Sequence, residues 1–221
     1  MEIVVGDGAR LEHIRVQNES RDAWHLGFTG VTQERDSHYR ACTLDLGGKL
    51  SRHNLHARLG GTNVETLLYG LYLARGEQLV DNHTAIFHDH PNCNSWEVYK
   101  GVLAEKAHGV FNGKVFVKPE AQKTDAKQTN RNLLLSDTAR IDTKPQLEIF
   151  ADDVKCTHGA TVGKLNEQQR FYLRTRGIAG REAEVMLITA FVSEVLSEIL
   201  QPQARESIAA LVAAEMDALI G

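Results

Sequence analysis

A cysteine and a histidine lie two residues apart within the segment Val154–Ala160. If this segment is a β-strand, Cys156 and His158 point to the same side, with their Cα atoms roughly 6.5–7 Å apart. A thiolate and an imidazole so placed can converge on one sulfur-bearing species or on one ion of iron, zinc or copper(I), which accept both ligand types. Two ligands do not close a metal site, and the pattern also fits a buried cysteine beside a surface histidine.

A second group of ligand-type residues lies upstream of this pair. His83, His88, His90 and Cys93 are all metal-ligand types, but their spacing matches no standard zinc motif. Pro91 predicts a turn among them. The group therefore indicates either a metal site in a structural β-solenoid or a polar loop at a corner of the fold.

The sequence lacks the motifs of several common enzyme classes. The chain has no Walker A loop, no dinucleotide-binding glycine fingerprint and no Gly-x-Ser-x-Gly elbow. Cys156 and His158 have no evident third group that would orient the imidazole of a catalytic dyad. A carbohydrate-active β-helix enzyme would need clustered carboxylates, and Asp142, Asp152 and Asp153 are available for this although no acidic ladder repeats. That class stays open as an alternative.

Charge and cysteine content narrow the choice of partners and compartment. A formal net charge of -4 provides no basic field for nucleic acid or an anionic membrane. No apolar run is long enough to span a bilayer, and residues 1–7 lack the pattern of a secretory signal. The three cysteines are widely separated, which argues against a disulfide framework and for a reducing compartment. We therefore expect a cytoplasmic protein without nucleic-acid or membrane partners.

Short strands up to residue 165 must position these candidate residues. Apolar stretches recur, several alternate apolar and polar residues with period two, and each is closed by glycine, aspartate, asparagine or proline. Most successive stretches end roughly one and a half dozen residues apart or a little less, and the interval from Gly76 to Glu105 is about two such units. This spacing favours the coils of a β-solenoid over a β-sandwich, whose strands are usually closer and joined by clearer hairpin turns.

The chain becomes helical near residue 166. Asn166 followed by Gln169 is a capping-box pattern, and Gly177 is a suitable residue to end a helix over 167–176. Two further helices are predicted over about 181–200 and 203–220, separated by Pro202. Their apolar stripes fit either mutual packing or a surface for a partner.

Three segments carry a resemblance to a known family. They are Val110–Gly113 with Ala121–Asp125, then Asp142–Ile149 with Ala151–Gly163, and finally Phe171–Ile178. These segments resemble the SufD branch of the SufB/SufD family, whose members are scaffolds for the assembly of iron–sulfur clusters. The Cys-Thr-His triplet at Cys156–His158 favours the SufD branch, because SufB proteins lack this cysteine.

The resemblance implies a fold and a set of partners. It implies a mainly β protein with a right-handed parallel β-helix over residues 1–165 and a small C-terminal helical domain over 166–221. Cys156 and His158 would lie where the β-helix meets SufB, and the helical domain would dock the SufC ATPase. The partner-binding residues so implied are Phe171, Tyr172, Arg174, Arg176, Gly177 and Phe191.

A scaffold of this kind is expected to be a subunit of a SufBCD complex and not an enzyme. It would hold no permanent cofactor, only transient iron or a nascent iron–sulfur cluster at the interface with SufB, and it would form a homodimer when SufB is absent. A lowered pKa of Cys156 would favour this role, with His158 as the nearest group to lower it. Family members usually carry further coils and a helical region before the first coil, so we expect residues 1–20 to be covered by another chain or frayed.

Overall fold

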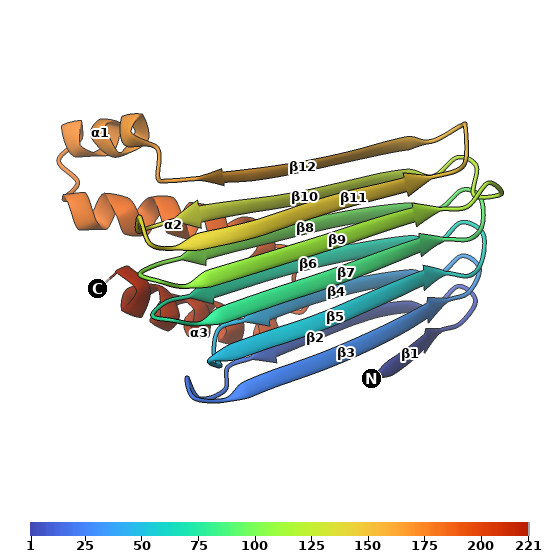
Figure 1. Ribbon diagram of the computed structural model, residues 1–221, viewed down its shortest axis with the longest axis horizontal. Coiled ribbons are helices and arrows are strands. Elements are labelled where there is room, and N and C mark those ends of the chain that lie inside the picture. The colour runs from blue at the N-terminus through green and yellow to red at the C-terminus, as the bar shows by residue number, and fades with distance from the viewer. Residues whose placement is uncertain (221) are drawn as a thin grey trace.

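The computed structural model describes residues 1–220, which fold into twelve β-strands followed by three α-helices (Figure 1). The strands are β1 (Glu2–Val5), β2 (Arg10–Gln17), β3 (Trp24–Gln33), β4 (His38–Asp45), β5 (Leu50–Leu59), β6 (Glu65–Ala74), β7 (Leu79–His88), β8 (Asn94–Leu103), β9 (His108–Val117), β10 (Asp125–Leu134), β11 (Arg140–Ile149) and β12 (Lys155–Gly163). The helices are α1 (Glu167–Thr175), α2 (Gly180–Leu196) and α3 (Pro202–Ile220). The predicted fold class, a β-solenoid with C-terminal helices, is confirmed.

Odd-numbered and even-numbered strands build two separate parallel sheets. One sheet has the order β1-β3-β5-β7-β9-β11, and the other has the order β12-β10-β8-β6-β4-β2. Leu50 pairs with Leu79, which pairs with His108, so a coil takes 29 residues at this place. The repeat seen in the sequence predicts a whole coil, but it is one strand with its corner, and two such units make a coil.

The interior of the solenoid is apolar towards the carboxyl ends of the odd-numbered strands. Side chains such as Leu55, Ala57, Ile86 and Val115 belong to one continuous buried cluster there. They alternate with outward-facing residues along each strand, as a sheet with one face on the core requires. This alternation fixes which side of every strand points inward, including the side chains of the candidate site.

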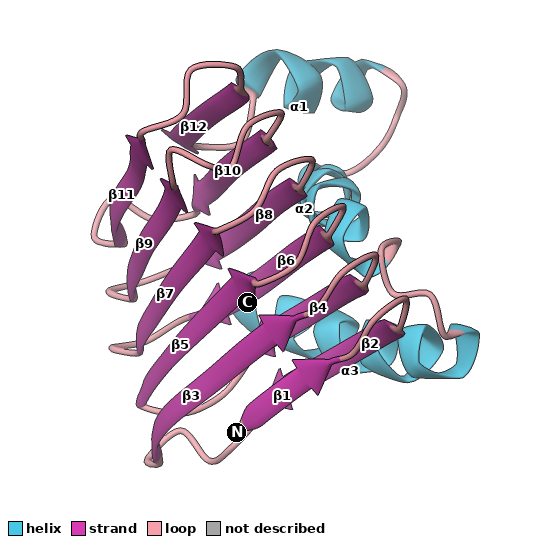
Figure 2. Ribbon diagram, turned by 90° about the vertical axis from the view of Figure 1, so that its right-hand side faces the viewer, coloured by secondary structure: helices cyan, strands magenta, loops and turns pink. Residues whose placement is uncertain are grey.

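Helices α2 and α3 cover the outer face of the even-numbered sheet (Figure 2). Leu71 and Leu73 of β6 face Val192 and Val195 of α2 and their neighbours in a second buried cluster. Both faces of β6 are therefore buried, which explains its nearly unbroken apolar run. The apolar stripes predicted for the last two helices pack within the chain, and the docking of a partner on this helical domain stays a prediction.

The helix boundaries follow local signals. The side chain of Asn166 accepts hydrogen bonds from the backbone of Gln168 at 2.9 Å and Gln169 at 3.2 Å, and Gly177 has a φ of 84°, as the capping pattern predicts. The helix expected over 181–200 instead ends at Leu196. Beyond it, Arg40 of β4 donates to the backbone oxygen of Glu198 at 2.9 Å, which draws this segment onto the sheet. None of the helices in residues 1–220 has the length and apolar content needed to cross a membrane.

Candidate functional site

Strand β12 forms one end of the even-numbered sheet. It pairs with β10 on one side, and no strand within residues 1–220 pairs with its other side. A side-chain carbon added at Gly159 or Gly163 would meet no atom within 4 Å. The strand therefore presents a free row of backbone donors and acceptors at the end of the solenoid.

Cys156 and His158 lie on the inward side of this edge strand. Cys156 is in register with Ala126, and His158 is in register with Gln128. Ala126 and Gln128 are both buried inside the solenoid, and register partners on parallel strands face the same way. Cys156 packs partly buried against the core cluster, whereas His158 is exposed because no further coil covers it. The structure thus brings the two residues together on one face, as the sequence predicts.

The thiol of Cys156 does not have the lowered pKa that would favour a role in cluster assembly. Burial raises the pKa of Cys156, the Asp125 carboxylate adds to the rise, and a hydrogen bond from the Ala126 backbone opposes it. The environment in this chain therefore favours the neutral thiol. Formation of a thiolate would need a change in surroundings, such as a metal ion or a partner's positive charge.

The second group of ligand-type residues is dispersed. His88 is fully buried, with its Nε2 2.8 Å from Ser95 Oγ and its Nδ1 3.5 Å from Thr124 Oγ1. His90 is exposed in the following loop, and the Cys93 thiol donates to the Gly61 carbonyl oxygen at 3.3 Å. His83 pairs instead with Asp81 at 2.8 Å. No group of three or more His, Cys, Asp or Glu side chains in residues 1–220 is placed to hold a metal ion.

The acidic residues considered for carbohydrate chemistry do not converge either. Asp142 contacts His108 Nε2 at 2.7 Å, and Asp153 is paired with Lys123. Asp152 is exposed next to the latter pair. These separate surface contacts offer no paired carboxylates for general acid and base catalysis.

Helix α1 and its C-cap residue Arg176 carry four of the six residues implied in partner binding. The helix has no buried residue, and its aromatic side chains Phe171 and Tyr172 are 68% and 57% exposed. The Arg176 guanidinium stacks over the Tyr172 ring at 5.3 Å from its centroid, and Arg174 is also exposed. Two aromatic rings beside two arginines make a surface of the type that protein interfaces use.

Phe191 does not belong to that exposed surface. It lies on α2, partly buried, with the amine of Lys100 at 4.4 Å from its ring centroid. Phe191 thus packs against β8, and its implied role in partner binding stays a prediction. Gly177 lies in the exposed turn between α1 and α2, where its positive φ ends α1.

An arginine ties α1 to α2. Arg170 pairs with Glu167 at 2.7 Å within α1 and with Glu184 of α2 at 2.5 Å. Residues 164–166 alone separate the end of β12 from the start of α1. The exposed aromatic surface and the edge strand are therefore consecutive parts of one continuous segment (Figure 1).

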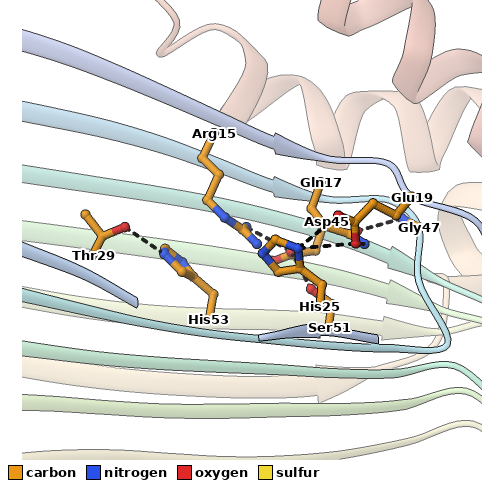
Figure 3. Close-up of polar contacts among 9 residues, drawn as sticks. All are labelled: Arg15, Gln17, Glu19, His25, Thr29, Asp45, Gly47, Ser51 and His53. Carbon is orange, nitrogen blue, oxygen red and sulfur yellow. Dashed lines mark hydrogen bonds and ion pairs between the residues drawn. The ribbon is translucent and has the colours of Figure 1, made fainter. Parts of the chain in front are cut away.

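Sequence reasoning missed the polar interior of the first coils (Figure 3). Arg15 of β2 pairs with the buried Asp45 of β4 at 2.9 Å, and Ser51 donates to the same carboxylate at 2.9 Å. Thr29 and His53 are hydrogen-bonded at 3.0 Å, and burial together with the charge of Arg15 lowers the pKa of His53 to about 4. In the sequence, this polar interior is indicated only by polar residues at inward positions of otherwise apolar strands.

Comparisons with known proteins agree with the geometry. A family model described as "SUF system FeS cluster assembly, SufBD core domain" matches residues 1–191. An iron–sulfur cluster assembly SufBD family protein of Synechocystis is 43% identical over 198 residues, which cover 90% of this chain and 44% of that protein. The iron–sulfur cluster assembly protein SufD of Escherichia coli is 39% identical over 201 residues, or 91% of this chain and 47% of that protein.

A plant relative shows the same proportions. A chloroplastic protein of Arabidopsis thaliana named ABCI7 is 40% identical over 207 residues, which cover 93% of this chain and 44% of that protein. The chain therefore spans about half the length of the curated relatives it matches.

Proposed function

This chain belongs to the SufBD core domain family of the SUF iron–sulfur cluster assembly system, and we propose that it acts there as a SufD-like, non-catalytic scaffold subunit. The observation that carries the proposal is the placement of Cys156 and His158 on the inward face of an unpaired edge strand. A soft thiolate and an imidazole at an open interface suit the handling of iron or sulfur in transit.

A SufB-type partner would complete the site by stacking on the β11–β12 end. Edge strands with free backbone groups readily accept a further strand, and a solenoid partner offers a matching coil. The partner would bury His158 and contribute the ligands that this chain lacks. Without it, two copies of this chain would use the same edge to form a symmetric dimer.

Iron, sulfur or a nascent cluster would be transient cargo at this interface. Burial raises the pKa of Cys156, so this chain by itself favours the neutral thiol over the thiolate that binds metal. The arrival of a metal ion or a partner's cation would favour the thiolate. Such a site binds cargo only when the complex is assembled.

A SufC-type ATPase would dock on α1, through Phe171, Tyr172, Arg174 and Arg176. This divides the work between residues 1–165, which present the cargo site, and residues 166–221, which receive the ATPase. Movement of α1 would reach β12 through residues 164–166. In a bacterium the complex would work in the cytoplasm.

Two measurements on complexes with the cognate SufB and SufC test the function. In the first, Phe171→Ala combined with Tyr172→Ala should abolish co-purification of SufC, while Leu211→Ala, an exposed apolar change on α3, should leave it intact. In the second, Cys156→Ser and His158→Ala should each lower cluster assembly by at least about tenfold, as loss of a ligand does. Full cluster assembly with both variants would remove the pair from the mechanism, and retention of SufC by the aromatic variant would remove α1 as its docking site.

A further inference from the structure

Three side chains lie at matched positions on the last three strands of the even-numbered sheet. Glu97 of β8 is in register with Gln128 of β10, which is in register with His158 of β12. Adjacent strands are about 4.8 Å apart, so the three side chains form a column on the inward face that runs from the interior to the open end.

The inner two members are bonded to each other and fully buried. The side-chain nitrogen of Gln128 donates to Glu97 Oε2 at 2.7 Å, and each residue is 1% exposed. The side-chain oxygen of Gln128 is buried without a hydrogen-bond partner within residues 1–220, as is Glu97 Oε1. A buried acceptor without a donor is costly, and it marks a place where a donor belongs.

The planar amide of Gln128 gives this free acceptor a direction. Its nitrogen donates to Glu97 of β8, and its oxygen, on the other side of the same planar group, is left for a donor from the neighbouring strand β12. The residue at that position on β12 is His158, whose imidazole carries at least one N–H donor in every protonation state. Strand spacing places the two side chains within reach of each other.

We propose that Glu97 and Gln128 are positioning residues for His158: Glu97 fixes the Gln128 amide, and the amide oxygen accepts the imidazole N–H of His158. Such a bond selects one tautomer and turns the other ring nitrogen towards the open end, where cargo would bind. A metal-binding histidine usually needs a bond of this kind on its second nitrogen. The inference rests on the proposed role of His158 and adds the residues that would orient it.

The environment of Glu97 suits this task. Burial raises the pKa of Glu97 to about 7, and the polar neighbours Thr84 of β7 and Gln128 of β10 limit the rise. Leu68, at the matched position on β6, adds only apolar contact. In either protonation state the Glu97 carboxyl group keeps an acceptor oxygen for the Gln128 amide nitrogen, which leaves the amide oxygen for His158.

The test measures the tautomer of His158 from the nitrogen chemical shifts of its ring, in the full chain with its imidazole neutral. We expect one tautomer to predominate in the wild type and the preference to be lost in Gln128→Met and in Glu97→Met, because each variant removes one polar member of the column. The control is Gln33→Met, the same change at an equally buried glutamine on β3, hydrogen-bonded to Thr66 at the other end of the solenoid. The control should keep the wild-type tautomer ratio.

An unchanged tautomer ratio in both column variants would overturn the inference. If Gln128→Met fails to fold, Glu97→Met decides alone, because it removes the acceptor of the Gln128 nitrogen while keeping a side chain of similar length. The result is independent of cluster assembly: full assembly with His158→Ala would refute the proposed function while leaving the tautomer measurement valid.

Discussion

The side-chain amine of Lys100 on β8 contacts both the backbone and the aromatic ring of Phe191 on α2. The amine of Lys100 donates to the Phe191 carbonyl oxygen at 2.9 Å and lies 4.4 Å from the ring centroid. Glu194 pairs with the same amine at 2.5 Å, and the Lys100 side chain is fully buried. This contact joins α2 to the sheet, so a substitution at Lys100 tests how much the contact contributes to the stability of the fold.

Two substitutions at Lys100 should separate the contribution of its apolar stem to stability from the contribution of its charge. We expect Lys100→Ala to lower the free energy of unfolding by about 2–4 kcal/mol, because it empties the space of a buried stem. Lys100→Met should cost less than half of that, since it refills the space and removes a buried amine whose pKa is lowered by burial. Urea unfolding measures both, with Lys127→Ala over the exposed Trp96 ring as a control of small effect. Equal losses for Ala and Met would show that the charge contacts dominate.

Glu97 should make the protein less stable as the pH rises. Its pKa in the folded chain is about 7, above the ordinary value of 4.5, so the folded state binds its proton more tightly than the unfolded state does. This contribution to stability is complete below pH 4.5 and disappears as the pH rises through 7, a difference of about 3 kcal/mol. Glu97→Gln should flatten this part of the curve in urea unfolding at a series of pH values. Parallel curves for wild type and variant would contradict the assignment.

His88 should have the opposite effect on the acid side. Burial lowers the pKa of His88 to about 4 from 6.5, so the unfolded state takes up its proton first. Stability from this group is complete above pH 6.5 and is lost as the pH falls through 4, by about 3 kcal/mol. His88→Gln should reduce the acid slope, whereas His90→Gln, at an exposed loop position, should leave it unchanged. An acid slope that survives in His88→Gln would assign it to other groups.

The three cysteines should differ in reactivity. Cys42 and Cys93 are buried, and burial raises the pKa of Cys42 to about 12. Cys156 is partly exposed, so an alkylating reagent should label it alone in the folded chain, slowly near neutral pH and faster in alkali because the thiolate is the nucleophile. Mass spectrometry after timed quenching would show this order. Labelling of Cys42 before unfolding would contradict the packing of α2 and α3 on the sheet.

The fold was largely predictable because it is local and periodic. The spacing of the apolar stretches predicts stacked strands, and Asn166 and Gly177 predict both ends of α1. The size of a coil was not predictable from this spacing, since one strand with its corner gives the same signal as a whole coil. The docking of α2 and α3 on β6 depends on contacts between residues more than a hundred positions apart, which the apolar run of β6 hints at without naming its partner.

The candidate site was predictable only in part. The parity of strand positions places Cys156 and His158 on one face, and this needs no tertiary knowledge. The raised pKa of Cys156 depends on burial against the coil before it, which spacing alone cannot reveal. The burial of His88 could not be predicted either. Its residue type and its neighbours suggest a metal ligand, whereas its inward position makes it a buried neutral side chain.

The short connection between β12 and α1 has a mechanical consequence. Helices α2 and α3 pack on β6 and β8, whereas the edge strand β12 lies at the end of the sheet, beyond these contacts. A pull on α1 strong enough to break the Arg170–Glu184 contact with α2 would load β12 at Gly163 and separate it from β10 one hydrogen bond after another, starting at the end farthest from Cys156. A small displacement would therefore separate only the residues near Gly163 and leave Cys156 paired with β10. Only a displacement along the whole of β12 would release Cys156.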